Sequence, residues 1–521
     1  MRTAAIFSDR MVLQREKPIA VWGDGKDGQR VTVSLGGHSD AATVRDGKWR
    51  VTLPPMPAAE NLTMTVTSGA VQIIYREIAV GEVWLCGGQS NMEFEIKDEL
   101  HGEAVLDSLR PECGVRFYYT PKQRIIDESF DAVERNTAWS YAAPESARAW
   151  SAVGLYFALA LAKRLGVTVG LIGCNWGGTS ASVWVSRDVL EQDAAIRPYI
   201  DEYDAATAGK TREALIAEFD EYAAYQDVWW GKYSAYMEEH PEASWEQAQE
   251  AVGASRYPGP MGPKNECRPC GGYETMLQRV APYTLRGFLY YQGESDDHRP
   301  AAYETLLTAL IGCWRRDWGD PELPFLNVQL PMFRYLNDPD YQHWCLIREA
   351  QMRVYRKLRN TGLAVLTDCG ELDNIHPKDK APVGYRLYLQ ALSEVYHLMP
   401  REQAAAPMMT GGYADGRSYV ILTENAAEGF RLTGEVTGFQ LAGSDGVFYP
   451  AAASFAPNRI TLTAEAVPRP EYARYAWTNY LAPVTVFGMN GLPLASFRTD
   501  SFGAQRAENT EKRNAPSASA E

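Results

Sequence analysis

The sequence predicts an α/β fold: a domain with a mostly parallel sheet, flanked by all-β segments and interrupted by a helical insertion. Between about residues 81 and 404, short apolar strands alternate with helical segments, which is the pattern of a parallel sheet with crossover helices. Before residue 80 and after about residue 405, short strands alternate with Gly-rich turns instead. That texture is typical of small β-sandwiches.

The first 80 residues contain strand-like runs at 18–22, 30–34, 42–44, 49–53, 62–67 and 71–74, with glycine pairs or Asp-Gly between several of them. We therefore expect an N-terminal β-sandwich-like domain over 1–80 and a C-terminal β domain over 405–502. The sequence does not decide whether these two segments form one domain or two. Residues 503–521 are polar and low in apolar content, which predicts a disordered tail.

The central region, 81–404, is predicted to be the catalytic domain. Its expected strands end near Cys86, Cys174, Tyr291, Gln329 and Thr367, and its expected helices lie at about 150–165, 300–316 and 344–358. Residues 188–256 are rich in Ala, Glu, Lys and Trp and look helical throughout. They are interpreted as an insertion that covers the site or makes an interface, followed by a loop around 258–269.

Composition excludes several classes of protein. The chain has 51 Lys and Arg against 66 Asp and Glu, a net charge of −15, so nucleic-acid binding is disfavoured. We expect no membrane span, because no apolar run approaches about 18 residues. The first residues lack the apolar region of a secretory signal, and a cytoplasmic location is expected.

Eight cysteines are scattered through the chain, several of them in apolar strands. This distribution predicts reduced, mostly buried thiols rather than a disulfide framework. Cys267 and Cys270 form one CxxC pair, but a structural zinc site needs a second pair or suitably spaced histidines. We therefore expect no metal and no cofactor.

Four polar clusters follow predicted strands, and in an open α/β sheet ligands bind beyond the carboxyl ends of the strands. The first cluster is Gly87-Gly88-Gln89-Ser90-Asn91. A tight turn after a strand can present the Ser90 hydroxyl as a nucleophile, with backbone N–H groups free to bind an oxyanion. Taken alone, this segment favours the alternative interpretation, in which Ser90 caps the following helix.

Of the two further clusters, the second is weak on its own, and the third supports a functional and a capping interpretation about equally. Glycines 177 and 178, in the run 175–180, could bring an N–H close to a substrate carbonyl, or could simply form a strand-to-helix turn. In the run 290–296, Gln292 could donate to an oxyanion and Glu294 could hold neighbouring groups, or Ser295 and Asp296 could cap a helix.

The fourth cluster is Asp373-Asn374-Ile375-His376-Pro377. A carboxylate three residues before an imidazole can fix its tautomer while His376 takes the Ser90 proton. A surface turn with a solvated histidine is the alternative interpretation. Of the other histidines, His298 lies nearest another cluster and is the main rival as general base.

Together these segments resemble the SGNH (GDSL-like) hydrolases, and more closely the sialate O-acetylesterase group of carbohydrate esterases. The matching segments occur in family order along nearly the whole chain. They are MVLQREKPIAVWG at 11–23, GEVWLCGGQSNMEF at 81–94, GLIGCNWGGTSASVW at 170–184, RGFLYYQGESD at 286–296, DNIHP at 373–377 and YAWTNY…NGLPLASFRTD at 475–500.

The resemblance implies a three-layer hydrolase domain with Ser90 as nucleophile, His376 as general base and Asp373 as the residue that orients it. It further implies an oxyanion hole built from the N–H groups of Ser90 and Gly178, or Gly177, and the side chain of Gln292. The neighbours of these groups are candidate substrate contacts: Gln89, Asn91 and Glu294. The chain departs from the family pattern at 271–276, GGYETM, where many members have a Leu-Tyr-Asn-Gly-Met run.

The expected activity is therefore removal of O-acetyl groups from sialic acid through an acetyl-enzyme. Two alternatives stay open: the same chemistry on acetylated xylan or another plant glycan, and a non-catalytic carbohydrate-binding protein. An Arg placed for a carboxylate would favour a sialic acid, whereas an open groove lined with Trp would favour a polymer. The expected partner is an acetylated carbohydrate, and the sequence gives no oligomeric state.

Overall fold

A mixed sheet runs through the centre of the molecule in the computed structural model, which describes residues 1–336, 340 and 342–502. Six of its strands are parallel neighbours, and β10 pairs antiparallel with β9 at one edge. In spatial order the strands are β10 (Ser140–Tyr141), β9 (Val115–Tyr119), β11 (Val169–Asn175), β8 (Val71–Gly88), β12 (Gly287–Tyr291), β13 (Phe325–Val328) and β14 (Thr361–Ala364).

The inner strands are apolar on both faces, as strands covered on both sides must be. Every residue of β11, β12, β13 and β14 is buried. The strands expected near 167–174, 285–291 and 324–329 are confirmed. The strand expected at 363–367 begins two residues earlier and ends at Ala364. Strand β9 had no counterpart among the predictions.

Strand β8 connects the N-terminal β segment to the central sheet without a break. Its first half pairs antiparallel with β7, and its second half pairs parallel with β11 and β12. The domain boundary expected at residue 80 therefore falls inside one continuous strand. A linker cannot be recognised there because residues 71–88 form one strand, even though Glu77, with a φ of +57°, departs from the extended conformation.

The N-terminal segment forms strands close to those predicted, and its apolar residues share one core with the central domain. One small sheet has the order β1-β3-β6, while β4, β5 and β7 extend from β8. These strands are β1 (Arg2–Thr3), β2 (Val12–Gln14), β3 (Ile19–Asp24), β4 (Arg30–Leu35), β5 (His38–Thr43), β6 (Lys48–Leu53) and β7 (Ala59–Ser68).

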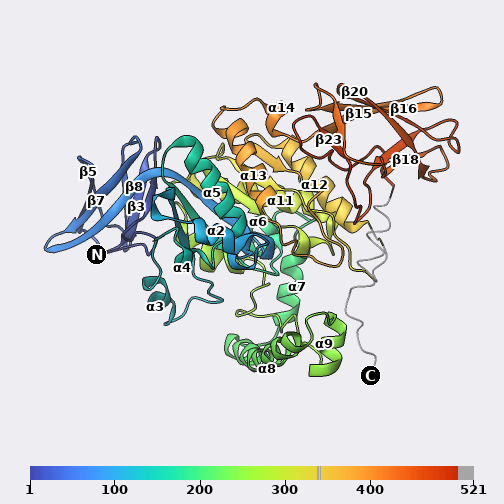
Figure 1. Ribbon diagram of the computed structural model, residues 1–521. Coiled ribbons are helices and arrows are strands. Elements are labelled where there is room, and N and C mark those ends of the chain that lie inside the picture. The colour runs from blue at the N-terminus through green and yellow to red at the C-terminus, as the bar shows by residue number, and fades with distance from the viewer. Residues whose placement is uncertain (337–339, 341, 503–521) are drawn as a thin grey trace.

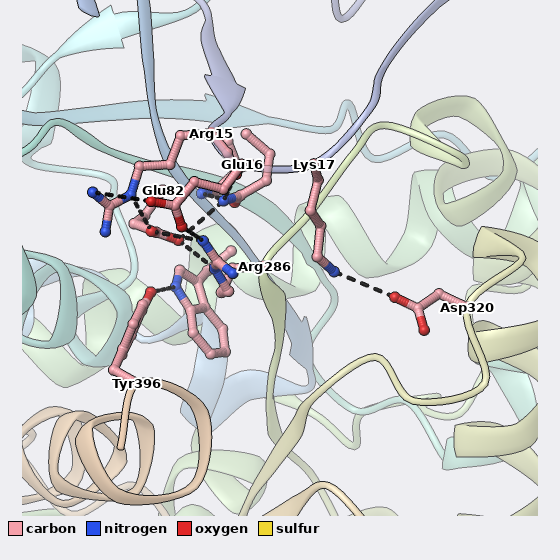
Figure 2. Close-up of polar contacts among 10 residues, drawn as sticks. Arg15, Glu16, Lys17, Glu82, Arg286, Asp320 and Tyr396 are labelled. Atoms are coloured by element: carbon pink, nitrogen blue, oxygen red, sulfur yellow. Dashed lines mark hydrogen bonds and ion pairs between the residues drawn. The ribbon is translucent and has the colours of Figure 1, made fainter. Parts of the chain in front are cut away.

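A buried carboxylate joins the N-terminal segment to the central sheet (Figure 2). Glu82, on β8, is fully buried and accepts two hydrogen bonds from Arg286, at 2.7 and 3.0 Å, and one from Arg15, at 2.6 Å. Gln14 donates a further bond at 3.1 Å. Arg286 immediately precedes β12, so this junction lies at the amino end of that strand.

The helices expected at 150–165, 300–316 and 344–358 are confirmed as α5, α11 and α12. The helices of the central domain are α1 (Ser90–Glu93), α2 (Gly102–Ser108), α3 (Phe130–Arg135), α4 (Pro144–Ala147), α5 (Ala152–Leu165), α10 (Gln278–Val280), α11 (Pro300–Trp318), α12 (His343–Lys357), α13 (Ala381–Gln390) and α14 (Arg401–Ala404). Single turns of 3₁₀-helix occur at 96–98, 111–113, 181–184 and 294–296, and π-helical turns at 273–277 and 391–395.

The insertion is helical, as predicted, and consists of α6 (Arg187–Glu191), α7 (Pro198–Thr207), α8 (Arg212–Glu239) and α9 (Trp245–Val252). In Figure 1 the pair α8 and α9 projects from one side of the central domain, with α7 leading out to it. The chain then returns through 253–272 as an extended loop. Part of this loop reaches the functional site described below.

The C-terminal segment has its own apolar core, which Met332 of the central domain joins. It lies at the opposite end of the molecule from the N-terminal strands (Figure 1), so the two β segments are separate units. Its strands are β15 (Met408–Asp415), β16 (Ser418–Glu424), β17 (Phe430–Leu432), β18 (Phe439–Ala442), β19 (Tyr449–Pro450), β20 (Ala452–Ala456), β21 (Arg459–Thr463), β22 (Tyr472–Tyr475), β23 (Val486–Gly488) and β24 (Phe497–Arg498).

The tail expected to be disordered, 503–521, lies outside the described residues. Among the helices that are described, none is both long and apolar enough to cross a bilayer. All eight cysteines lie in the described part of the chain and are free thiols, five of them buried.

Candidate active site

Ser90 stands on a tight turn at the carboxyl end of β8. The turn depends on Gly88, whose φ is +136°, and an added Cβ there would lie 2.0 Å from the carbonyl oxygen of Tyr291. Only glycine lets the backbone pass this close to β12. The Gln89 N–H then donates to the Tyr291 oxygen at 3.1 Å, and α1 begins at Ser90.

The Ser90 hydroxyl forms a hydrogen bond with the imidazole of His376, with 2.8 Å between Oγ and Nε2. His376 lies on the loop that follows β14, and Glu371 holds this loop. Glu371 accepts from Asn374 Nδ2 at 2.8 Å and from the Lys378 N–H at 2.9 Å, while Asn374 Oδ1 accepts the His376 N–H at 3.0 Å. These bonds fix the backbone of the loop that carries His376.

The surroundings of His376 favour its neutral form. Burial lowers the pKa of His376 below its usual 6.5, and the nearby charge of Lys380 lowers it further, while Glu93 acts in the opposite direction. A neutral imidazole can accept a proton from a serine hydroxyl. The rival base, His298, is exposed, and its ring contacts Tyr199 edge-on.

The structure does not bring the Asp373 carboxylate onto His376. Asp373 is exposed, its φ is +61°, and its Oδ1 accepts the Leu336 N–H at 3.0 Å. Among the described residues, no hydrogen bond or ion pair joins Asp373 to the imidazole. The sequence spacing places the two residues on one loop, but the turn at Asp373 directs its side chain elsewhere.

The second cluster lies directly against the Ser90 turn, because a Cβ at Gly177 would be 3.4 Å from Ser90 Cβ. The Gly177 N–H donates to Glu93 Oε2 at 2.7 Å, and Lys122 binds the other oxygen of Glu93. Gly177 is therefore not free to bind an oxyanion. In the part of the chain that the structure describes, the backbone N–H groups of Ser90 and Gly178 have no hydrogen-bond partner.

Gln292 does not have a free donor, contrary to the expectation that it lines an oxyanion hole. It is buried, and its Nε2 already faces three acceptors: Gln89 Oε1 at 3.1 Å, the Thr179 oxygen at 3.2 Å and Asp296 Oδ2 at 2.6 Å. Its Oε1 accepts from Tyr303 at 3.0 Å. A primary amide has two N–H donors, so both are used within the protein.

The three residues expected to contact substrate are instead buried and bound to protein groups. Gln89 donates to Ser295 Oγ at 3.1 Å and accepts from Gln292. Asn91 donates to Glu294 Oε1 at 2.7 Å and to the Ile375 oxygen at 2.9 Å. They join the clusters to one another, and local sequence could not reveal this because the partners lie about 200 or more residues away.

The loop after the insertion also reaches this site. Cys267 Sγ lies 3.4 Å from the Gly178 oxygen and 3.7 Å from the Tyr257 hydroxyl. An added Cβ at Gly178 would lie 2.9 Å from that same hydroxyl. Tyr257 and Cys267 therefore form one wall beside Gly178. The CxxC pattern had marked Cys267 without linking it to this site, and no local pattern pointed to Tyr257.

A cationic side chain, Arg124, lies near the second cluster and binds the residue that precedes Cys267. The Arg124 guanidinium is 5.5 Å from the ring centroid of Trp176 and 5.4 Å from that of Phe219 on α8, and its Nε donates to Glu266 at 3.3 Å. Its side chain is 44% exposed, and among the described residues its terminal nitrogens have no hydrogen-bond partner. Trp176 precedes Gly177, which contacts Ser90.

Comparison with known proteins shows which family this chain is similar to. The family model "Carbohydrate esterase, sialic acid-specific acetylesterase" matches residues 266–390, the part that carries His376. Sialate O-acetylesterases of Mus musculus and Homo sapiens are 28% and 25% identical to this chain, over 76% of it and 73% and 71% of their own length. The chain is similar to the sialate O-acetylesterase group of carbohydrate esterases, and the relatives and the family model agree in this.

A solved structure supports the same assignment along almost the full length of the chain. A carbohydrate acetylesterase from Xanthomonas citri is 26% identical, with a TM-score of 0.76 over 96% of this chain and 100% of that one. The esterase family model, the curated relatives and this structure together indicate that the chain is a carboxylic ester hydrolase. The flanking β segments are thus part of a shared architecture with the Xanthomonas protein.

Proposed function

We propose that this chain removes O-acetyl groups from a sialic acid, using Ser90 as nucleophile and His376 as general base within a three-layer hydrolase domain of the SGNH type. The observation that carries the proposal is the 2.8 Å hydrogen bond between Ser90 Oγ and His376 Nε2. A non-catalytic carbohydrate-binding protein would have no need of this pair at the carboxyl ends of the strands.

The proposed reaction has two steps. Ser90 Oγ attacks the acetyl carbonyl while His376 accepts its proton, and collapse of the tetrahedral intermediate releases the sugar hydroxyl, protonated by His376. Water then attacks the acetyl-enzyme with His376 again as base, releasing acetate and restoring Ser90. No step requires a metal or a cofactor.

The oxyanion of both tetrahedral intermediates would be bound by the backbone N–H groups of Ser90 and Gly178. These are the donors that the surrounding protein leaves without partners, whereas Gly177 and Gln292 are engaged. Preorganised donors aimed at the developing charge are usually the largest catalytic contribution in acyl transfer. The bond from Gly177 to Glu93 holds the adjacent peptide in place for this role.

Arg124 supports a sialic acid over a neutral plant glycan. A sialic acid carries a carboxylate, and a partly exposed guanidinium with free terminal nitrogens can bind a carboxylate through two parallel hydrogen bonds. Arg124 stacks on Trp176, one residue from the Gly177 that contacts Ser90. An acetylated xylan has no group that would require this charge, so the xylan alternative has less support.

The decisive experiment measures acetate release from a di-O-acetylated sialic acid and from acetylated xylo-oligosaccharides, with wild type and Ser90→Ala in parallel. We expect release from the sialic acid, lost in Ser90→Ala and retained in Ser108→Ala, which changes an exposed serine on α2. Ser90-independent release would reject the proposed nucleophile. Ser90-dependent release from xylan fragments alone would reject the sialic acid as substrate.

A further inference from the structure

A buried lysine lies four residues after His376, and the reaction described above does not use it. Lys380 is 1% exposed and precedes α13. Its Nζ donates to Asn91 Oδ1 at 2.5 Å and lies 4.7 Å from the ring centroid of Phe94 and 5.8 Å from that of Tyr291. Removing an ammonium group from water is energetically costly. The interactions of the buried Lys380 must therefore offset this cost.

The residue that Lys380 binds holds the two halves of the site together. Asn91 follows Ser90 directly, is fully buried, and donates to the carbonyl oxygen of Ile375, which directly precedes His376. Its other contact is Glu294 Oε1, in the third cluster. One amide therefore spans the nucleophile turn and the histidine loop.

Lys380 fixes the direction in which this amide points. A lysine ammonium has only donors, so it can bind only the oxygen side of the Asn91 amide. With the oxygen held by Lys380, both N–H groups must face the acceptors on Glu294 and Ile375. A flipped amide would place N–H groups against the ammonium and its oxygen against two other oxygens.

A small number of ionisable groups surround Lys380, Glu294 and His376. Lys380 is faced by the carboxylates of Glu294, Glu371 and Glu99 and by the Cys369 thiol, and burial lowers its pKa to about 8. Glu294 has one oxygen without a partner among the described residues, and burial raises its pKa to about 7. His376 is faced by Lys380 and, with opposite effect, by Glu93.

We propose that Lys380 is a positioning residue for acyl transfer, which through Asn91 locks the His376 loop against the Ser90 turn and by its positive charge disfavours protonation of His376. This proposal rests on the proposed function, because it assigns Lys380 a role within the same site. The orientation matters because a displacement of about 1 Å in a catalytic group can reduce a rate by roughly 10²-fold. Among the described residues, Lys380 forms no hydrogen bond with Ser90 or His376, so its effect passes through Asn91 and through its charge.

The test compares Lys380→Met, Lys380→Gln and Lys380→Arg with Lys378→Met, which changes an exposed lysine two residues away. The measurements are kcat and KM for a small aryl acetate, the pH profile of kcat/KM, and the unfolding temperature. Glutamine keeps an N–H donor for Asn91 without the charge, and arginine keeps the charge. These variants separate positioning from electrostatics.

We expect Lys380→Met to lower kcat by about 10²-fold with KM within about threefold, and to move the acid limb of the pH profile to higher pH. Compared with Lys380→Met, Lys380→Gln should recover much of kcat while its acid limb stays at the higher pH. Lys380→Arg should have its acid limb at the same pH as the wild type. Lys378→Met should match the wild type throughout. A role confined to stability would change the unfolding temperature and leave the acid limb in place.

Wild-type kcat and an unshifted acid limb in folded Lys380→Met would overturn the inference. If that variant does not fold, Lys380→Gln decides the matter, because an unshifted limb there rejects the electrostatic role. The failure of this inference is distinct from failure of the proposed function. In the first case Ser90→Ala is inactive while the Lys380 variants behave as wild type, and in the second Ser90→Ala remains active.

Discussion

Ser90 and His376 are 286 positions apart in the chain, and their side chains are joined by a hydrogen bond of 2.8 Å. The distance along the chain is bridged by the sheet, because Ser90 follows β8 and His376 follows β14 at the same edge. The geometry is that of a nucleophile and its base. Its consequences for pH dependence, for the third triad residue and for substrate choice can each be measured.

The acid limb of the kcat/KM profile should lie below pH 6.5. Burial and the Lys380 charge lower the pKa of His376, and the base must be neutral to act. Activity is therefore present above the lowered pKa and is lost as the pH falls through it. Glu93→Gln, which removes the opposing charge, should move the limb still lower. A midpoint at pH 7 or above would contradict this account.

Asp373→Asn tests whether the third residue of the predicted triad takes part. Asp373 is bound to the Leu336 N–H in the structure, but catalytic hydrogen bonds in free enzymes often form only with substrate. If Asp373 then orients His376, kcat should fall by roughly 10²- to 10⁴-fold. Ser90→Ala combined with Asp373→Asn should be no worse than Ser90→Ala alone, since a triad acts as a unit.

A loss of less than about threefold in Asp373→Asn would show that Ser90 and His376 act as a dyad. In that case the orientation of His376 comes from its own loop, where Glu371 binds Asn374 and Lys378 on either side of it. Glu371→Gln would then become the more damaging change. The two outcomes can be told apart, because the Glu371 side chain binds Asn374 and Lys378 of this loop, whereas the Asp373 side chain binds the Leu336 N–H.

Arg124→Ala should raise KM for the acetylated sialic acid by about tenfold and leave the kinetics of a neutral acetylated sugar unchanged. Loss of a charge-assisted hydrogen bond to a bound carboxylate has about this effect. Arg124→Lys keeps the charge but not the planar guanidinium, so its KM for the acetylated sialic acid should lie between those of the wild type and Arg124→Ala. An equal effect on both substrates would mean that Arg124 only secures Trp176 and Phe219.

Gly178→Ala should lower kcat by about 10²-fold, the effect of disturbing one oxyanion donor. Gly178 has a φ of +75°, and the added Cβ would meet the Tyr257 hydroxyl at 2.9 Å. Gly166→Ala is the matched control, because its φ is +66° and its Cβ would have open space. Both variants carry similar backbone strain, so a kcat loss in Gly178→Ala alone locates the effect at the site.

Particular residues show how far the sequence could predict this site. Ser90 and His376 were predictable because each lies in a short polar run at the end of an apolar strand, and parallel strands bring such runs together. Gln292 was misassigned because its donors are taken by Gln89, Thr179 and Asp296, contacts that exist only in the folded chain. Whether a polar side chain is free is a property of packing.

Other site residues, and one domain boundary, were harder to predict from the sequence. Glu93 is one helical turn from Ser90, a spacing that could have flagged it, whereas nothing local distinguishes Arg124 or Tyr257 among many similar residues. The boundary expected at residue 80 failed for a related reason. The continuous strand β8 serves two sheets, and sequence patterns detect a change of element better than a change of partner.

The junction at Glu82 should dominate the acid stability of the protein. Burial alone would raise the pKa of Glu82, but the hydrogen bonds and charges of Arg286 and Arg15 outweigh burial and lower it. A carboxyl whose folded pKa is depressed contributes stability that is fully present above its unfolded pKa, near 4.5, and is lost as the pH falls through its folded value. Unfolding should therefore become easier below about pH 4.

Glu82→Gln should lower the free energy of unfolding at pH 7 by about 3 kcal/mol, because it leaves two partly buried guanidinium groups without their carboxylate. Glu16→Gln is the control, since Glu16 also pairs with Arg286, at 3.3 Å, but its side chain is 60% exposed and the change should cost less than about 1 kcal/mol. Both are measured by urea unfolding at pH 7 and pH 4. The difference in unfolding free energy between Glu82→Gln and wild type should begin to narrow at pH 4, because protonation of the Glu82 carboxyl in the unfolded state then reduces the stability of the wild type. A gap that does not depend on pH would assign the loss to packing instead.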